Sequence, residues 1–347
     1  MAAEPDAPPQ VGRKSGWPEL LASLTIVFVF LSLVLPAIGP AHRGPRRDSE
    51  VRVEIGNFEN AIVLFKVTYG VEPPSGIVLY AEEAGWNQDR RSRGLIRQIW
   101  PKFDFATCGG MENVPAEGIR LNGAECLVFF LGGLASPVGG EMNGFSRNPT
   151  HPFSTTETAR EGPFVEFKGG YSAKERRWIG RLVDQDRDGF PEYLDPLPGQ
   201  TQPYLYANSG LGKGYRIEDL GGAMSDVYRD RNGAAFKPKD FQIISPGADG
   251  KYGLGGLFDP ENRNMVLVAD RVVERDNVTN FIVGTLGELS EPRTTILITL
   301  GIITLDVFLM IAVARKLRWT GWLSLLLFIV LGMVITGLVI PAIFSVS

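Results

Sequence analysis

The amino-acid sequence predicts an α+β domain that lies between membrane-spanning helices. Residues 20–38, 296–313 and 323–343 form almost wholly apolar segments, and a helix of about 20 such residues crosses a bilayer core of roughly 30 Å. A helical stripe of apolar residues follows the first segment. The residues between the segments hold most of the 41 glycines and 24 prolines, which indicates a domain rich in loops.

These observations divide the chain into five parts. They are a cytoplasmic tail (1–17), transmembrane helix 1 (18–39), an exported domain (40–292), transmembrane helix 2 (293–315) and transmembrane helix 3 (319–344). Arg315, Lys316 and Arg318 occupy the short connection between the last two helices, and basic residues in short loops stay in the cytoplasm. We therefore expect a multi-pass protein of the inner (cytoplasmic) membrane with its large domain in the periplasm.

Two features of the apolar segments allow other interpretations. Gly39 and Ala41 are small residues placed as a cleavage site requires, so the first segment could instead be a signal peptide. Asp306 is a carboxylate inside the second segment. Such a residue is a functional hypothesis by default, with a helix partner or a proton path as its role, unless it is hydrated or paired locally near Arg315.

Composition and motifs argue against several classes of protein. The net charge of -4 with mixed signs argues against a nucleic-acid surface. The two histidines, His42 and His151, belong to no HExxH motif, and no GxSxG or P-loop motif is present, so we expect no enzyme. Cys108 and Cys126 do not have zinc-site spacing. In an exported domain they form either one disulfide or two buried free thiols.

An amphipathic helix is predicted to follow the first apolar segment. Apolar residues recur at spacings of three and four, which places them on one face of a helix. They are Val51, Ile55, Phe58, Ile62, Phe65 and Tyr69. The helix should end near Gly70, because glycine favours a helix C-terminus and Pro73 and Pro74 follow.

An acidic segment at residues 184–195 carries the strongest local motif. Asp184, Asp186, Asp188, Gly189, Glu192 and Asp195 fill positions 1, 3, 5, 6, 9 and 12 of a calcium-loop template, and Phe190 offers its carbonyl at position 7. Alternating carboxylates in a tight turn repel each other unless a cation lies between them. Asp195 stands where the template has a bidentate glutamate, and Pro191 disturbs the second half. The segment predicts a structural calcium site, with a solvated acidic turn as the alternative.

Three segments resemble one known family. EIGNFENAIVLFKVTYGVEPP (54–74) looks like the helix of type II secretion major pseudopilins, which are type IV pilin-like proteins. FQIISPGADGKYG (241–253) is similar to the S-x-G-A-D-G loop of that family, and RDNVTNF (275–281) resembles its closing motif. LNGAECLVFFLGGL (121–134) is similar to the enlarged members found in planctomycete-type bacteria.

The resemblance implies a fold and a second ion site. The fold would be a pilin-like long N-terminal helix with an antiparallel sheet and a large insertion at about 77–170, to which this chain adds a C-terminal two-helix transmembrane hairpin. The family's calcium site would be formed here by Ser245, Asp249, Asp276 and Asn277, with glycine-rich turns that hold no ion as the alternative. Glu19 and Pro36 have the family's glutamate-to-proline interval, but Lys14 stands where the glycine before the cleavage site belongs.

The predicted function follows from the resemblance and from the membrane segments together. We expect a non-enzymatic, membrane-anchored docking or scaffold component of a type II secretion or type IV pilus-like system. Its partners would be other membrane subunits of that system and the lipid bilayer, without nucleic acid. One alternative is a filament subunit that polymerises after N-terminal processing. Another is a periplasmic ligand-binding or sensor module.

Overall fold

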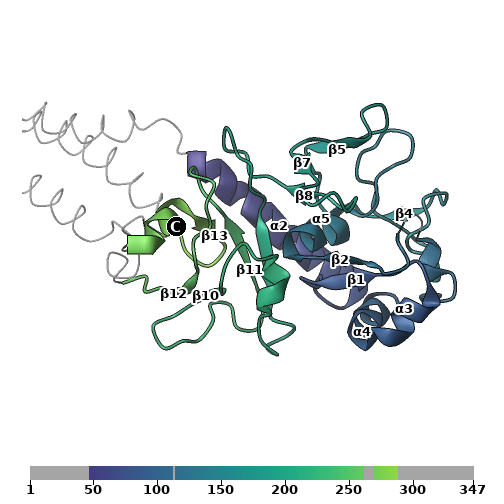
Figure 1. Ribbon diagram of the computed structural model, residues 1–347, viewed down its shortest axis with the longest axis horizontal. Helices are drawn as coiled ribbons and strands as arrows, with labels where there is room; N and C mark the ends of the chain where they lie inside the picture. Colours follow the sequence, from purple (N-terminus) through teal and green to yellow (C-terminus); the bar gives the residue numbers. More distant parts are fainter. Residues whose placement is uncertain (1–46, 112–113, 262–268, 288–347) are drawn as a thin grey trace, which may run out of the picture. The chain divides into compact units, whose positions relative to one another are not determined.

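The computed structural model describes residues 47–111, 114–261 and 269–287 (Figure 1). These residues belong to one compact unit, 46–290. The helices are α2 (Arg47–Tyr69), α3 (Glu83–Gln88), α4 (Arg90–Ile99) and α5 (Gly123–Gly132), and the 3-10 helices are η1 (Cys108–Gly110), η2 (Ile217–Leu220) and η3 (Ala269–Asp276).

The strands of the described residues are short and form six separate sheets. The strands are β1 (Ile77–Leu79), β2 (Ile119–Leu121), β3 (Phe145–Ser146), β4 (Arg160–Glu161), β5 (Gly169–Ser172), β6 (Arg177–Gly180), β7 (Leu182–Val183), β8 (Glu192–Tyr193), β9 (Leu205–Asn208), β10 (Tyr228–Arg229), β11 (Phe241–Ser245), β12 (Gly256–Leu257) and β13 (Val278–Thr279). The largest sheet has the order β13-β11-β9 and is antiparallel. The pairs β1-β2, β3-β4, β5-β6 and β7-β8 are antiparallel, and β10-β12 is parallel.

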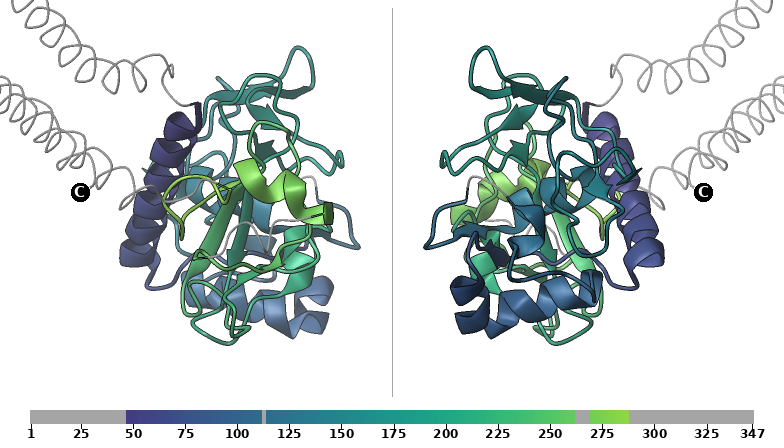
Figure 2. Two further views of the ribbon diagram at one scale, coloured as in Figure 1. Left: turned by 90° about the vertical axis from the view of Figure 1, so that its left-hand side faces the viewer. Right: turned by 90° about the vertical axis from the view of Figure 1, so that its right-hand side faces the viewer.

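The apolar stripe of α2 faces the core, as its periodicity predicts. Val51, Ile55, Phe58, Ile62 and Phe65 are at most 3% exposed, and α2 lies along one side of the domain in both views of Figure 2. The N–H of Gly70 bonds the Lys66 carbonyl at 2.8 Å, and Gly70 has a φ of 80°. A left-handed residue just after the last turn is a common helix ending that glycine adopts without a Cβ clash.

Helix α5 is the centre of the domain. All ten of its residues are buried, and it packs beside α2, β8 and β9. Its first turn is closed by Asn122, whose Oδ1 accepts hydrogen bonds from the N–H groups of Ala124 (2.8 Å) and Glu125 (3.2 Å). Because the helix is buried along its whole length, its side chains form part of the core rather than an amphipathic surface.

The predicted fold class is wrong. The sequence predicts one antiparallel sheet on a long N-terminal helix, but the strands of the described residues are divided among small sheets, the largest of three strands. Glycines and prolines interrupt the extended runs after a few residues, which keeps the strands short. The C-terminal hairpin of that prediction lies outside the described residues.

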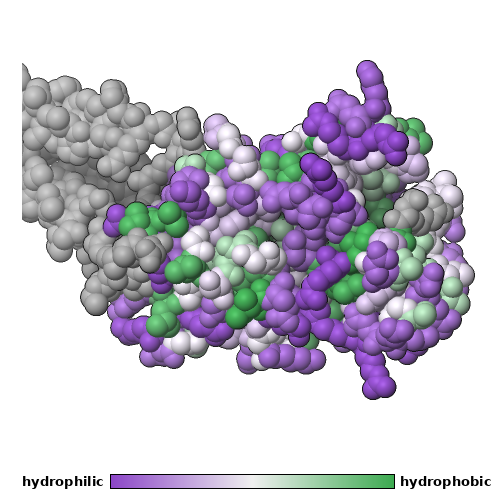
Figure 3. Space-filling view, viewed as in Figure 1, coloured by the Kyte–Doolittle hydropathy of each residue, from purple (hydrophilic) through white to green (hydrophobic). Residues whose placement is uncertain are grey.

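The prediction of a multi-pass inner-membrane protein is also contradicted. In the part of the chain that the structure describes, no helix combines the length and the apolar character needed to cross a bilayer. α2 has 23 residues, but charged and amide side chains interrupt it on its outer faces. The segments 18–39, 293–315 and 319–344, and with them Glu19 and Asp306, lie outside the described residues. The face of the domain in Figure 3 is mostly hydrophilic, with apolar patches between the polar residues.

Both cysteines are free thiols. Cys108 in η1 and Cys126 in α5 are buried at 1% and 0% exposure. Burial raises the pKa of each thiol. Of the two interpretations that the sequence left open, the structure has the buried thiols.

Candidate metal centre

The acidic turn, defined here as residues 184–191, connects β7 to β8. The two strands pair as Leu182 with Tyr193 and Val183 with Glu192, so the turn begins and ends at one point. Leu182 and Tyr193 are buried, which fixes the register of the hairpin. The aspartates are therefore held on a closed loop whose base is part of the core.

Backbone N–H groups of the turn point at its own carboxylates. Asp184 accepts hydrogen bonds from the N–H of Asp188 (3.1 Å) and of Gly189 (3.1 Å), and Asp188 accepts one from Phe190 (2.8 Å). Gly189 has a φ of 100°, a conformation that favours glycine. These bonds close the chain around a group of carboxylate oxygens, as the aspartate spacing predicts.

Glu125 joins this group from α5. One carboxylate oxygen each from Glu125, Asp186 and Asp188 lie within 4.8 Å of one another. Asp186 is exposed, Asp188 is half-buried and Glu125 is fully buried. The Phe129 ring of α5 contacts Phe190 of the turn edge-on, with 5.6 Å between ring centroids. A ring contact and a group of carboxylates therefore lie at the same junction between α5 and the acidic turn.

The two oxygens of Glu125 have different surroundings. Oε2 accepts a hydrogen bond from the Asn122 N–H at 2.6 Å, which completes a capping box at the start of α5. Oε1 is buried and has no hydrogen-bond partner. A buried carboxylate oxygen without a partner is costly. A cation beside it would remove that cost.

Burial and mutual repulsion raise the pKa of three carboxyls in this centre. Burial raises the pKa of Glu125 to about 9, against the hydrogen bond from Asn122 and with the help of the nearby Asp188 and Glu192 charges. Burial likewise raises the pKa of Glu192 to about 7 and that of Asp188 to about 6. Among the described residues, no lysine, arginine or histidine forms an ion pair with any member of the cluster Glu125, Asp186 and Asp188.

Asp195, predicted at position 12 of the calcium template, serves another network. Its Oδ2 accepts hydrogen bonds from Ser245 Oγ (2.5 Å) and Gln200 Nε2 (2.9 Å), and its Oδ1 accepts one from the Leu197 N–H (3.0 Å). Asp195 therefore ties the segment after β8 to the end of β11. Glu192 at position 9 stays near the turn, where its Oε2 accepts a hydrogen bond from the Gln185 N–H (3.1 Å).

Each of the four residues of the second predicted ion site forms hydrogen bonds in the structure, two of them with each other. The Asp249 N–H donates to Asp276 Oδ2 at 2.9 Å, so these two residues meet. Ser245 instead bonds Asp195. The Asn277 amide donates to Tyr228 Oη (3.1 Å) and to the Tyr252 carbonyl (2.8 Å). These contacts arrange the loops around β11 and β13 by hydrogen bonds.

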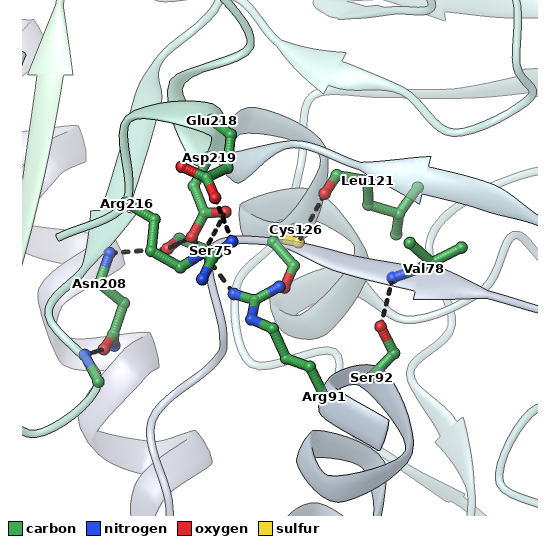
Figure 4. A network of polar contacts seen from close by, with 12 residues as sticks. Ser75, Val78, Arg91, Ser92, Leu121, Cys126, Asn208, Arg216, Glu218 and Asp219 are labelled. Atoms are coloured by element: carbon green, nitrogen blue, oxygen red, sulfur yellow. Dashed lines mark hydrogen bonds and ion pairs between the residues drawn. The ribbon is translucent and has the colours of Figure 1, made fainter. Parts of the chain in front are cut away.

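A buried serine and aspartate form a further polar network (Figure 4). Ser75 Oγ donates to Asp219 Oδ2 at 2.8 Å and accepts from the Asn208 N–H at 2.9 Å. Arg91 Nη2 lies 3.6 Å from the same Asp219 oxygen. His151 is elsewhere, against Thr107 and Thr150, and His42 lies outside the described residues. The network connects η2, β9 and α4, and it lacks the histidine base of a nucleophilic triad.

Glu125 is not among the residues that the sequence predicts for the candidate metal centre. It lies 59 residues before Asp184 in the chain, and its only local signal is the Asn122-x-x-Glu125 capping box. Comparison of the chain with protein-family models, with curated proteins and with solved structures gave no match.

Proposed function

We propose that this protein is a non-enzymatic docking or scaffold component of a type II secretion or type IV pilus-like assembly, with a structural calcium ion that orders its loops. The proposal combines the resemblance of three segments with the acidic centre. It assigns the domain a role in holding shape and binding other proteins rather than in chemistry.

The observation that carries the proposal is the contact between the three resembling segments. Asn280 Nδ2, from the closing motif, donates to Glu59 Oε1 on α2 at 3.1 Å. β11 pairs with β13 through Ile244 with Thr279 and Ser245 with Val278. Segments whose contacting residues lie as far apart in the chain as Glu59 and Asn280, 221 residues, are thus packed as one unit, as parts of one ancestral domain would be.

The acidic centre supports the structural role of the ion. Calcium takes oxygen ligands in irregular arrangements, and it needs no catalytic partner to stabilise a loop. A cation that binds only the folded state raises the free energy of unfolding by about 2.7 kcal/mol at a hundredfold excess over its dissociation constant. That increment is large against the usual net stability of a domain, about 5–15 kcal/mol.

Chemical cross-linking in the native cell tests the proposed function. A full-length tagged protein should cross-link to subunits of a secretion or pilus-assembly system, identified by mass spectrometry. An unrelated tagged protein from the same cell compartment serves as the control for non-specific capture. Cross-linking only to proteins of other systems, at the level of the control for secretion subunits, contradicts the proposal.

A further inference from the structure

The acidic turn alone does not complete an ion site. Asp186 is exposed and both oxygens of Asp184 already accept backbone hydrogen bonds. An exposed carboxylate such as that of Asp186 binds a cation weakly by itself, because calcium is held by several oxygen ligands together. The additional group that the geometry supplies is the fully buried Glu125, with its unpartnered Oε1.

We propose that Glu125, Asp186 and Asp188 are the side-chain ligands of one calcium ion that joins α5 to the acidic turn. This inference rests on the structural ion of the proposed function and assigns its ligands. Asp184 shapes the turn through its two hydrogen bonds from the backbone. Glu192 adds negative charge from the base of the hairpin.

The donor set selects a hard cation. All three ligands are carboxylates, whereas zinc and copper sites favour nitrogen and sulfur. Cys126 is the next residue in α5, but its Sγ lies against the Leu121 carbonyl at 3.9 Å. Magnesium demands near-ideal octahedral geometry at about 2.0–2.1 Å, whereas calcium accepts irregular shells at about 2.3–2.6 Å. A turn and a helix from distant parts of the chain suit the less demanding ion.

Ion binding would connect two elements that otherwise meet only through side-chain packing. Glu125 Oε2 remains with the Asn122 N–H, while Oε1 is available to the ion. The ion would then fix the start of α5 and the tip of the β7-β8 hairpin relative to each other. The ion would also hold the neighbouring ring contact between Phe129 and Phe190 in place.

A tryptophan beside the turn provides an optical probe. Trp178 Nε1 donates to the Gly189 carbonyl at 3.2 Å. Terbium, which replaces calcium on oxygen ligands, emits when a nearby tryptophan is excited. Terbium emission in the full-length protein should therefore rise on titration and fall when calcium is added. Trp178→Phe should remove most of the emission, while calcium binding measured by calorimetry persists.

Two ligand variants test the assignment in the full-length protein. Glu125→Gln and Asp186→Asn should each weaken calcium binding at least about tenfold, and magnesium should bind the wild type at least about tenfold more weakly than calcium. Asp186 is exposed, so its variant does not put folding at risk. Glu261→Gln, at a side chain that is 79% exposed, should bind calcium like the wild type.

The outcomes separate the ligand assignment from the proposed function. A loss of affinity in Asp186→Asn with wild-type affinity in Glu125→Gln overturns the role of Glu125, while the structural ion remains. An absence of calcium and terbium binding overturns the site altogether. A site that behaves as proposed, in a protein that cross-links to no secretion subunit, leaves this inference standing and contradicts the proposed function instead.

Discussion

Glu54 on α2 and Arg181, which immediately precedes β7, form a two-point ion pair although 127 residues separate them. Arg181 Nη1 donates to Glu54 Oε1 at 2.8 Å, and Nη2 donates to Oε2 at 2.5 Å. Tyr204 Oη donates to the same carboxylate at 2.8 Å. The pair is 15–19% exposed. It fixes the strand that leads into the acidic turn against the long helix of the domain.

Removal of the Glu54 carboxylate should destabilise the domain. Glu54→Ala removes the acceptor of the Tyr204 hydroxyl and leaves the Arg181 guanidinium with only the Leu194 carbonyl. Breaking a buried pair costs about 3–5 kcal/mol. Since the pair is partly solvated, we expect the lower end of that range, measured by urea unfolding. Arg177→Ala removes an exposed pair with Glu175 and should cost less than about 1 kcal/mol. Equal losses of unfolding free energy in Glu54→Ala and Arg177→Ala would contradict the stabilising role of the Glu54–Arg181 pair.

The capping box of α5 should link helix stability to ion binding. Asn122→Ala removes the acceptor of two N–H groups, and loss of such a cap costs about 1 kcal/mol. It also loosens the backbone that positions Glu125, so calcium affinity should fall together with stability. Asn122→Asp keeps the acceptor and should preserve the cap. An alanine variant with wild-type stability and wild-type affinity contradicts this link.

Two glycines in helices should respond to alanine in opposite ways. A Cβ on Gly123 would lie 1.7 Å from the Tyr206 carbonyl oxygen, so Gly123→Ala must displace α5 from β9 and should destabilise by roughly 1–3 kcal/mol or more. A Cβ on Gly94 in α4 meets no atom within 4 Å. Gly94→Ala should stabilise by about 0.5–1 kcal/mol, because alanine is the better helix former. Thermal unfolding of both variants tests this prediction, and destabilisation of Gly94→Ala would contradict the open space found around Gly94.

The ion-free protein should be less stable at mildly basic than at mildly acidic pH. Burial raises the pKa of Glu125 to about 9 and that of Glu192 to about 7, from 4.5 for each in the unfolded chain. The folded protein then binds more protons than the unfolded chain, so this contribution is complete below about pH 4.5 and is lost as pH rises through 7 and 9. Urea unfolding of ion-free protein at about pH 5 and pH 8 measures the decline.

Two comparisons make this pH test specific. Glu125→Gln should flatten the decline, because the group that titrates furthest from its ordinary value is gone. Saturating calcium should also flatten it, since the ion takes the place of the protons. A free energy of unfolding that rises from pH 5 to pH 8 in the ion-free wild type would show that burial does not raise the pKa of these carboxyls.

The parts of the account that the sequence predicts are local. The spacing of Val51, Ile55, Phe58, Ile62 and Phe65 identifies the buried face of α2, because helical periodicity depends only on neighbouring residues. The acidic turn is likewise local, since the Asp184 carboxylate accepts hydrogen bonds from the N–H groups of Asp188 and Gly189 in the same turn.

The parts that the sequence does not predict depend on long-range packing. Glu125 reaches the turn only because α5 is buried beside β8. Asp195 fits the calcium template by position, yet its carboxylate accepts a hydrogen bond from Ser245 of β11. The division of strands into small sheets depends on which loops pair across the domain, and local propensity does not encode that choice.

The proposed calcium ion lies between α5 and the acidic turn. The most direct test of this position is a crystal structure of the full-length protein grown with calcium, with a terbium-exchanged crystal used for anomalous scattering. We expect one strong anomalous peak with carboxylate oxygens of Glu125, Asp186 and Asp188 at about 2.3–2.6 Å. A peak at another group of residues, or no peak beside Glu125 at saturating ion, would contradict this position.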